Sequence, residues 1–287
     1  MKQKKIQPKV IPILRSSFHL ILTNKTIIFP YALILFFQLL ILEILYFIPR
    51  WPLNVFFDPI ISKLWSENSV HYPFNIALLP KLFYFATMPA YILLFSFLIC
   101  MSISTIMMVN NDERPKLGKA FKRLLPYYVY IVVGAAIMLF VNVSLIHGFD
   151  LIFARATRLQ STTGPLYWLK MTIIHGAAYF KILLNILGTT LFAYVFPLIV
   201  IEKRNVFIAI FENLKYVFTA PIKTFFLVFF PTLLYVMIIL FKGHVPMEAE
   251  IPEMRVLYIS LSALVTIFMD AMIYTSITTF YLLRKGQ

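Results

Sequence analysis

Four polar residues inside long apolar runs are the positions at which this sequence could do chemistry: Glu43, Lys181, Asn185 and Asp270. A charge near the centre of a bilayer costs at least about 2.5–3.5 kcal/mol, so it needs a partner or a function. We predict that the helix faces of these residues converge on one outward-opening pocket, in which Glu43 and Asp270 face Lys181. Asn185 is the alternative partner of Asp270, which is the strongest single candidate.

Helical geometry places these side chains at similar depths. At a rise of about 1.5 Å per residue, Glu43, Lys181, Asn185 and Asp270 lie about 27, 30, 24 and 21 Å above the predicted inner surface, and Asn142 lies level with Asn185. All of them therefore fall in the outer half of the membrane. The alternative is that Glu43 and Lys181 each reach separately to the outer interface, while Asp270 makes only a structural hydrogen bond.

Patterns typical of catalytic or metal sites are not found in the sequence. Four histidines fall on the predicted outer side, and none has a second ligand at helical spacing: His71, His147, His175 and His244. The single Cys100 cannot form a disulfide framework or a thiolate metal site. We therefore predict no catalytic residue, no metal, no cofactor and no enzymatic activity.

The composition places the chain in a membrane. Of its 287 residues 61% are hydrophobic and 13% are charged, against about one half and one quarter in soluble domains. Six apolar runs are long enough to cross a bilayer as helices: 26–48, 82–109, 125–147, 176–201, 222–241 and 256–283. These unbroken runs lack the alternation of about ten residues that barrel strands show. We predict an all-α integral membrane protein with one polytopic domain, 1–287, kinked at prolines 30, 89, 197 and 231.

Positive charge predicts the orientation. Alternate connecting segments hold 17 of the 26 Lys and Arg residues: the N-terminus to 25, 110–124, 202–223 and the tail from 284. The positive-inside rule makes this side cytoplasmic, so both termini are predicted to lie on the cytoplasmic side of the cell membrane. A net charge of +14 could also suit nucleic acid. Topology and anionic lipid headgroups account for it without nucleic acid, so membrane lipids are the predicted partners.

Three basic amphipathic segments precede the first, third and fifth apolar runs: 10–22, 116–125 and 206–218. Each is predicted to lie as a short helix at the cytoplasmic interface, with one phenylalanine toward lipid (Phe18, Phe121 and Phe211) and one basic residue in water (Arg15, Lys122 and Lys215). They predict three parallel hairpin repeats over 1–109, 110–201 and 202–287. The alternative is that basic, amphipathic inner loops are ordinary in polytopic proteins.

Two connecting segments could bind a partner. The longest predicted outer loop, 49–81, contains Trp51, Trp65 and Tyr72, which suit a helix at the headgroup level, with a ligand-binding loop as the alternative. At the inner surface, Glu202 and Glu212 lie among basic residues and could dock a cytoplasmic protein. The alternative there is a solvated face, stabilised by a Glu212–Lys215 pair at i,i+3 spacing.

Three patches carry a family resemblance: residues 113–126 (ERPKLGKAFKRLLP), 196–215 (FPLIVIEKRNVFIAIFENLK) and 280–284 (FYLLR). Together they resemble the six-span membrane family found beside glycerophosphodiester phosphodiesterase domains and as stand-alone YciC-like proteins. Glu202 and Ala209 occupy that family's acidic and alanine positions before the fifth span. No soluble phosphodiesterase domain occurs in this sequence, so the resemblance implies a membrane scaffold and not hydrolysis.

Two functions follow as hypotheses. The first is a multi-pass membrane scaffold or accessory subunit without catalytic activity, which contacts anionic lipid or a partner protein. The alternative is a transporter of a small solute or lipid, with the polar level of Glu43, Lys181 and Asp270 as its pocket. An intramembrane enzyme ranks third, because no nucleophile or metal cluster can be assembled from the runs.

Overall fold

The computed structural model describes residues 9–159, 163–244 and 253–285, and every regular element in these residues is helical. Six helical segments are long and apolar enough to cross a membrane: Lys25–Phe47, Phe74–Asn110, Leu117–Arg158, Gly164–Ile201, Pro221–Leu240 and Met254–Lys285. The predictions of an all-helical class and of six candidate spans are confirmed. Several segments are longer than the predicted runs, because a helix continues through polar residues that an apolar run excludes.

The six segments are built from named helices as follows. They comprise α2 (Lys25–Phe47); α4 (Phe74–Ala90), the π-helical turn η2 (Tyr91–Phe95) and α5 (Ser96–Asn110); α6 (Leu117–Leu124), the 3-10 turn η3 (Leu125–Tyr127) and α7 (Tyr128–Arg158); α8 (Gly164–Leu191) and α9 (Val195–Ile201); α11 (Pro221–His244); and α12 (Met254–Lys285). Three further elements lie outside them: α1 (Val10–Thr23), α3 (Leu53–Leu64) with the 3-10 turn η1 (Glu67–Val70), and α10 (Val206–Thr219).

Two of the four predicted proline positions coincide with breaks in helix geometry. Pro89 lies two residues before η2, where the hydrogen-bond ladder widens to π spacing. Pro197 lies in the first turn of α9, where its missing N–H needs no partner. Pro30 and Pro231 lie inside α2 and α11, which continue past them.

The break between α8 and α9 is held by one buried side chain of α10. Asn213 is fully buried, and its Oδ1 accepts from the backbone N–H of Tyr194 at 2.9 Å. Its Nδ2 donates to the backbone carbonyl of Leu191 at 2.6 Å. Backbone N–H and C=O groups that lose their helical partners inside a membrane protein need other hydrogen bonds. Asn213 supplies two such hydrogen bonds at this break.

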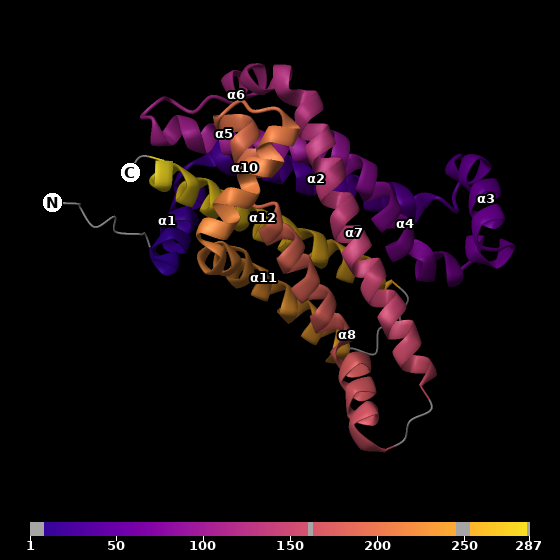
Figure 1. Cartoon of the computed structure of the whole chain (residues 1–287). Coiled ribbons are helices and arrows are strands. Elements are labelled where there is room, and N and C mark those ends of the chain that lie inside the picture. The colour runs from indigo at the N-terminus through magenta and orange to yellow at the C-terminus, as the bar shows by residue number, and fades with distance from the viewer. Residues whose placement is uncertain (1–8, 160–162, 245–252, 286–287) are drawn as a thin grey trace.

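The described ends of the chain lie at one end of the bundle, together with α1, α6 and α10, and we call it the termini end (Figure 1). The opposite end, which we call the far end, carries α3, the end of α7 and the start of α8 (Figure 1). The centre of the bundle is α5, which packs against α2, α12 and α9. Its Cys100 and Ile103 are fully buried, whereas Phe140 of α7 is 72% exposed. Large apolar side chains on the outside are what a surface in contact with lipid requires.

The three predicted amphipathic segments form α1, α6 and α10. Phe18 of α1 packs edge-on against Phe268, with ring centroids 6.4 Å apart, and Phe121 of α6 packs against Phe97 at 5.5 Å. Phe211 of α10 is 75% exposed. A short helix followed by two long segments recurs three times along the chain. The interfacial position of these helices and their relation by repetition stay predictions.

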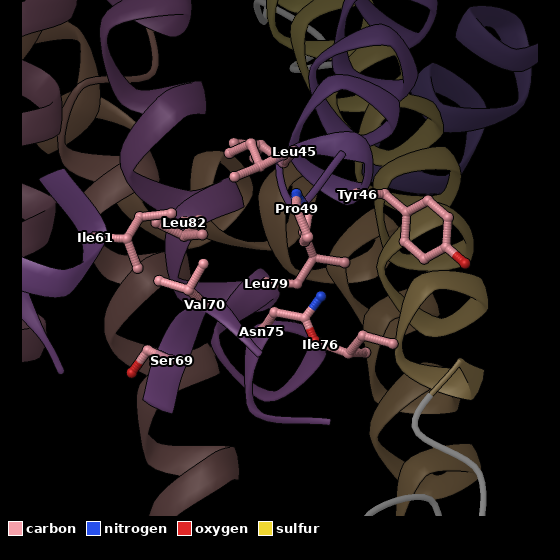
Figure 2. Close-up of a pocket in the computed structure, with 11 residues that line it drawn as sticks. Leu45, Tyr46, Pro49, Ile61, Ser69, Val70, Asn75, Ile76, Leu79 and Leu82 are labelled. Atoms are coloured by element: carbon pink, nitrogen blue, oxygen red, sulfur yellow. The ribbon is translucent and has the colours of Figure 1, made fainter. Parts of the chain in front are cut away.

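The far end is closed by a small apolar core. Residues of α2, α3, η1 and α4 surround a cavity of about 10 Å³, with Leu79 and Ile61 buried beside it (Figure 2). That volume is about the size of a single water molecule. The predicted outer loop is thus a packed subdomain in which Lys81 lies over the Trp65 ring at 5.5 Å, while Trp51 is 82% exposed.

Candidate functional site

A cavity of about 290 Å³ lies between five of the six candidate spans. Its wall comes from α2, from α4 with η2, from α7, from α8 and from α12. Seven of its lining residues carry amide, hydroxyl or carboxyl groups other than phenols: Gln38, Thr87, Asn142, Asn185, Thr189, Thr266 and Asp270. The volume is close to the lower end of ligand pockets, about 300 Å³. A polar cavity shared by five spans is the strongest candidate site in the described residues.

Asp270 is the one carboxylate in the lining of this cavity. It is half-buried and lies near the middle of α12, 16 residues after the first residue of that helix and 15 before the last. No described residue forms a hydrogen bond or an ion pair with it, and the titratable side chains on which its charge acts are the phenols of Tyr31, Tyr91 and Tyr274, which supply no positive charge. A carboxylate in this position requires a proton or a positively charged ligand to offset its lost hydration.

Asn142 of α7 enters the cavity because α8 has no side chain opposite it. A Cβ built on Gly188 would lie 1.9 Å from the Asn142 Oδ1 atom, so only glycine permits this approach. Asn142 Oδ1 and Gln38 Oε1 are both buried, and neither has a hydrogen-bond partner among the described residues. Buried polar atoms are nearly always partnered, so two orphaned oxygens beside one cavity indicate groups prepared for a ligand or for water.

The structure brings together two of the four predicted site residues. Asn185 of α8 and Asp270 of α12 line the same cavity, and Asn142 lines it with them. Lys181 instead forms an ion pair with Asp150 of α7 at 2.7 Å, in which both side chains are nearly half exposed. Glu43 is exposed and is not part of the lining. Lys181 meets Asp150 because α7 and α8 pack side by side as neighbours in the chain.

Gln38 and Gly188 were missed by reasoning from the sequence. Gln38 is a neutral amide, and its burial costs less than that of an ionisable group, so it is a weaker signal of function in a sequence. It nevertheless stands in an otherwise apolar stretch of α2, which was a usable signal. Gly188 follows Asn185 by three residues and so shares its helix face, but nothing in the sequence indicates that Asn142 packs against it.

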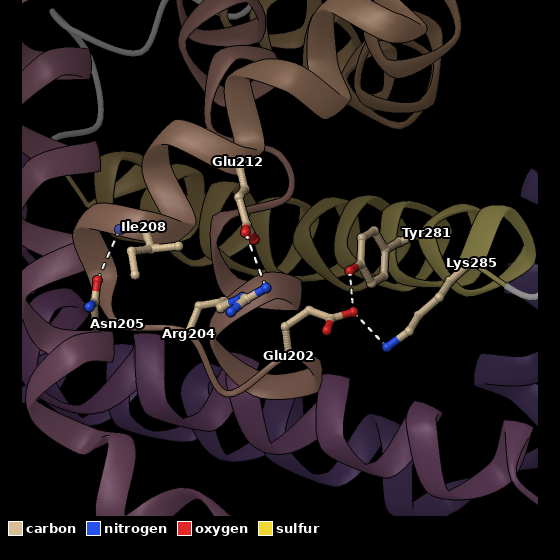
Figure 3. Close-up of polar contacts among 7 residues, drawn as sticks. All are labelled: Glu202, Arg204, Asn205, Ile208, Glu212, Tyr281 and Lys285. Carbon is tan, nitrogen blue, oxygen red and sulfur yellow. Dashed lines mark hydrogen bonds and ion pairs between the residues drawn. The ribbon is translucent and has the colours of Figure 1, made fainter.

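A second polar cluster lies at the termini end. Lys285 Nζ contacts Glu202 Oε1 at 2.6 Å, and the Tyr281 hydroxyl donates to the same oxygen at 2.7 Å (Figure 3). Partial burial alone would raise the pKa of Glu202, but the hydrogen bonds from Lys285 and Tyr281 outweigh it and lower that pKa below its usual range. Glu202 is therefore ionised at neutral pH.

The predicted Glu212–Lys215 pair is replaced by a pair between different elements. Glu212 Oε1 lies 3.3 Å from Arg204 Nη2, in the connection between α9 and α10 (Figure 3). That connection is brought back to α10 by Asn205, whose Oδ1 accepts from the Ile208 N–H at 2.9 Å as a helix N-cap. The bend places Arg204 closer to Glu212 than the helical spacing places Lys215.

Metal-binding geometry is not seen in the part of the chain that the structure describes, where no three His, Cys, Asp or Glu side chains gather. The side chain of His244 lies outside the described residues. No protein-family model, curated protein or solved structure matches the chain. The resemblance to the six-span family beside glycerophosphodiester phosphodiesterase domains and in YciC-like proteins therefore stays a prediction.

Proposed function

We propose that this protein is a membrane transporter that takes up a small solute, or the polar group of a lipid, in the Asp270 cavity. One observation carries the proposal: a carboxylate and two buried amide oxygens, none of which has a hydrogen-bond partner among the described residues, meet in one cavity lined by five spans. Transporters place their binding sites near the middle of the membrane, between helices that can move relative to one another. The proposed function requires no covalent step.

The chemistry of the lining defines the ligand. The Asp270 carboxylate, Gln38 Oε1 and Asn142 Oδ1 are hydrogen-bond acceptors, and an ionised carboxylate offers acceptors only. A ligand that satisfies them must donate hydrogen bonds, and a positive charge would offset that of Asp270. The ligand class that fits best is a small protonated amine, or an ammonium group attached to a lipid.

The orientation in the membrane belongs to the same proposal. We place the termini end in the cytoplasm and the far end outside the cell membrane, because the segments that hold 17 of the 26 positive residues in the sequence include 110–124 and 202–223, which contain α6 and α10 at the termini end. Single cysteines at Asn68 or Pro165, in a Cys100→Ala background, should react with an impermeant thiol reagent in intact cells. A cysteine at Lys116 should not react, and its labelling would reverse the orientation. Gln287 is also predicted inside but lies outside the described residues.

Uptake into proteoliposomes tests the transport function. We expect the purified full chain to accumulate at least one of three radiolabelled amines, methylamine, ethanolamine or choline. Asp270→Asn keeps the shape and removes the charge, so it should reduce uptake at least about tenfold. The matched control is Asp150→Asn, which removes a carboxylate from an exposed ion pair on the neighbouring α7. Equal uptake by the Asp270→Asn and wild-type proteins would reject the proposed role of Asp270.

The scaffold function is the second candidate, and a different observation favours it. Three phenylalanines of α10 are at least about two thirds exposed: Phe207, Phe211 and Phe218. An apolar face beside basic residues suits anionic lipid or a partner protein at the cytoplasmic surface. A stoichiometric partner that copurifies with the wild-type chain and is lost on Phe211→Ser, with no amine uptake by either protein, would favour the scaffold over the transporter.

A further inference from the structure

A separate pocket of about 360 Å³ lies at the termini end, where the α9–α10 connection, α10 and the end of α12 meet. Its charged lining consists of two carboxylates and three cations: Glu202, Glu212, Arg204, Lys215 and Arg284. None of these residues lines the Asp270 cavity. The pocket is therefore a second site, independent of the proposed transport function.

The carboxylates of this pocket are already neutralised. Lys285 and Tyr281 hold Glu202 on one side, and Arg204 holds Glu212 on the other (Figure 3). Lys215 and Arg284 have no carboxylate within ion-pair distance among the described residues. The pocket thus keeps an excess of positive charge that the described chain does not balance.

Arg284 is held in place by aromatic rings and not by an acid. Its guanidinium carbon lies 5.7 Å from the ring centroid of Tyr216 and 5.5 Å from that of Phe280, and its Nη1 is 3.5 Å from the Tyr216 carbonyl oxygen. Tyr216 in turn packs edge-on against Tyr281 at 5.2 Å. One guanidinium N–H is thus taken by a backbone carbonyl, while no described carboxylate pairs with the remaining N–H groups. Guanidinium N–H groups are donors that suit phosphate oxygens.

The surroundings of the pocket favour a lipid as the source of the phosphate. Phe207, Phe211 and Phe218 of α10 are 66%, 75% and 72% exposed, so apolar surface adjoins the cationic lining on the same helix. A headgroup phosphate would meet the cations while its acyl chains continue over apolar side chains. We propose that this pocket binds the phosphate group of an anionic membrane lipid, with Arg284 and Lys215 as its ligands.

Native mass spectrometry of the full chain in detergent tests this proposal with three probes: dioctanoyl phosphatidylglycerol, dioctanoyl phosphatidylcholine and inorganic phosphate. We expect the anionic lipid to bind at least about tenfold more tightly than the zwitterionic lipid. Lys215→Gln and Arg284→Gln should each weaken anionic lipid binding by about tenfold. Lys63→Gln, which removes the same charge from an exposed position on α3 at the far end, should leave it unchanged.

A third variant separates ligand binding from folding. Glu212→Gln releases Arg204 and removes one negative charge from the pocket, so it should tighten anionic lipid binding. A merely structural role of the cluster predicts the opposite, because the variant loses an ion pair. Equal affinity for the two lipids, unchanged binding by Lys215→Gln, or binding of inorganic phosphate as tightly as the lipid would overturn the proposal.

Discussion

The Asp270 cavity and the pocket at the termini end differ in which polar groups the protein leaves without partners. In the cavity, a carboxylate and two amide oxygens have none within the described part of the chain. In the pocket, each carboxylate has a cation, and it is cations that remain. The same kinds of residue therefore prepare one region for a donor or a cation and the other for an anion. The comparison teaches that the polar groups left without hydrogen-bond or ion-pair partners, more than the residue types present, indicate what a site can bind.

The largest expected effect contrasts two asparagines. Asn213→Ala leaves the Tyr194 N–H and the Leu191 carbonyl without their buried partner, which should cost about 3 kcal/mol of unfolding free energy. Asn142→Ala removes an orphaned oxygen and should be nearly neutral. Thermal melting of both variants in detergent measures the difference. Equal destabilisation would show that Asn142 is as structural as Asn213.

A smaller effect tests the close approach behind the cavity. Gly188→Ala puts a methyl group where Asn142 Oδ1 now lies, so we expect a loss of about 2 kcal/mol from the forced shift. In an Asn142→Ala background the same change should cost much less, because the displaced amide is gone. A double-mutant cycle from melting curves measures this coupling, and additive costs would contradict the packing described here.

The pH dependence of stability tests the pocket. The folded-state pKa of Glu202 is lowered, so its contribution is present above its ordinary value of about 4.5 and is lost as pH falls through the lowered value. We expect at most about 1 kcal/mol, because solvent screens the pair. Lys285, Tyr281 and Arg204 are the titratable groups that act on it. Comparing melting between about pH 6 and pH 3 should show a smaller acid loss for Glu202→Gln than for the wild type.

The smallest effect concerns Lys181, which the sequence predicts to be the partner of Asp270 because the two lie at similar depths. Lys181→Gln breaks an exposed pair with Asp150 and should cost only about 0.2–1 kcal/mol. It should leave amine uptake within about twofold of wild type, in contrast to Asp270→Asn. If Lys181→Gln lost as much uptake as Asp270→Asn, Lys181 would have to be counted among the residues of the transport site. The contrast between exposed and unpartnered charges would then be weakened.

Much of the architecture was readable from the sequence because it depends on local pattern. Unbroken apolar runs such as 26–48 require helices, since only a helix or a closed barrel satisfies the backbone in lipid. The residues of 206–218 predict an amphipathic helix, and Pro197 predicts the nearby break in the helix. Both predictions depend only on residues close together in the chain. Rise per residue also brought Asn185, Asn142 and Asp270 to similar depths, and these three do line one cavity.

Only the tertiary structure decided which of those residues face one another. Rise along a helix gives a depth, but the direction in which a side chain points depends on how each helix is rotated and which helices are neighbours. That is why Lys181 meets Asp150 instead of Asp270, and why Glu43 stays outside the cavity. The contact of Asn142 with Gly188 depends in the same way on two helix faces that no local pattern specifies, because packing is a property of the whole bundle.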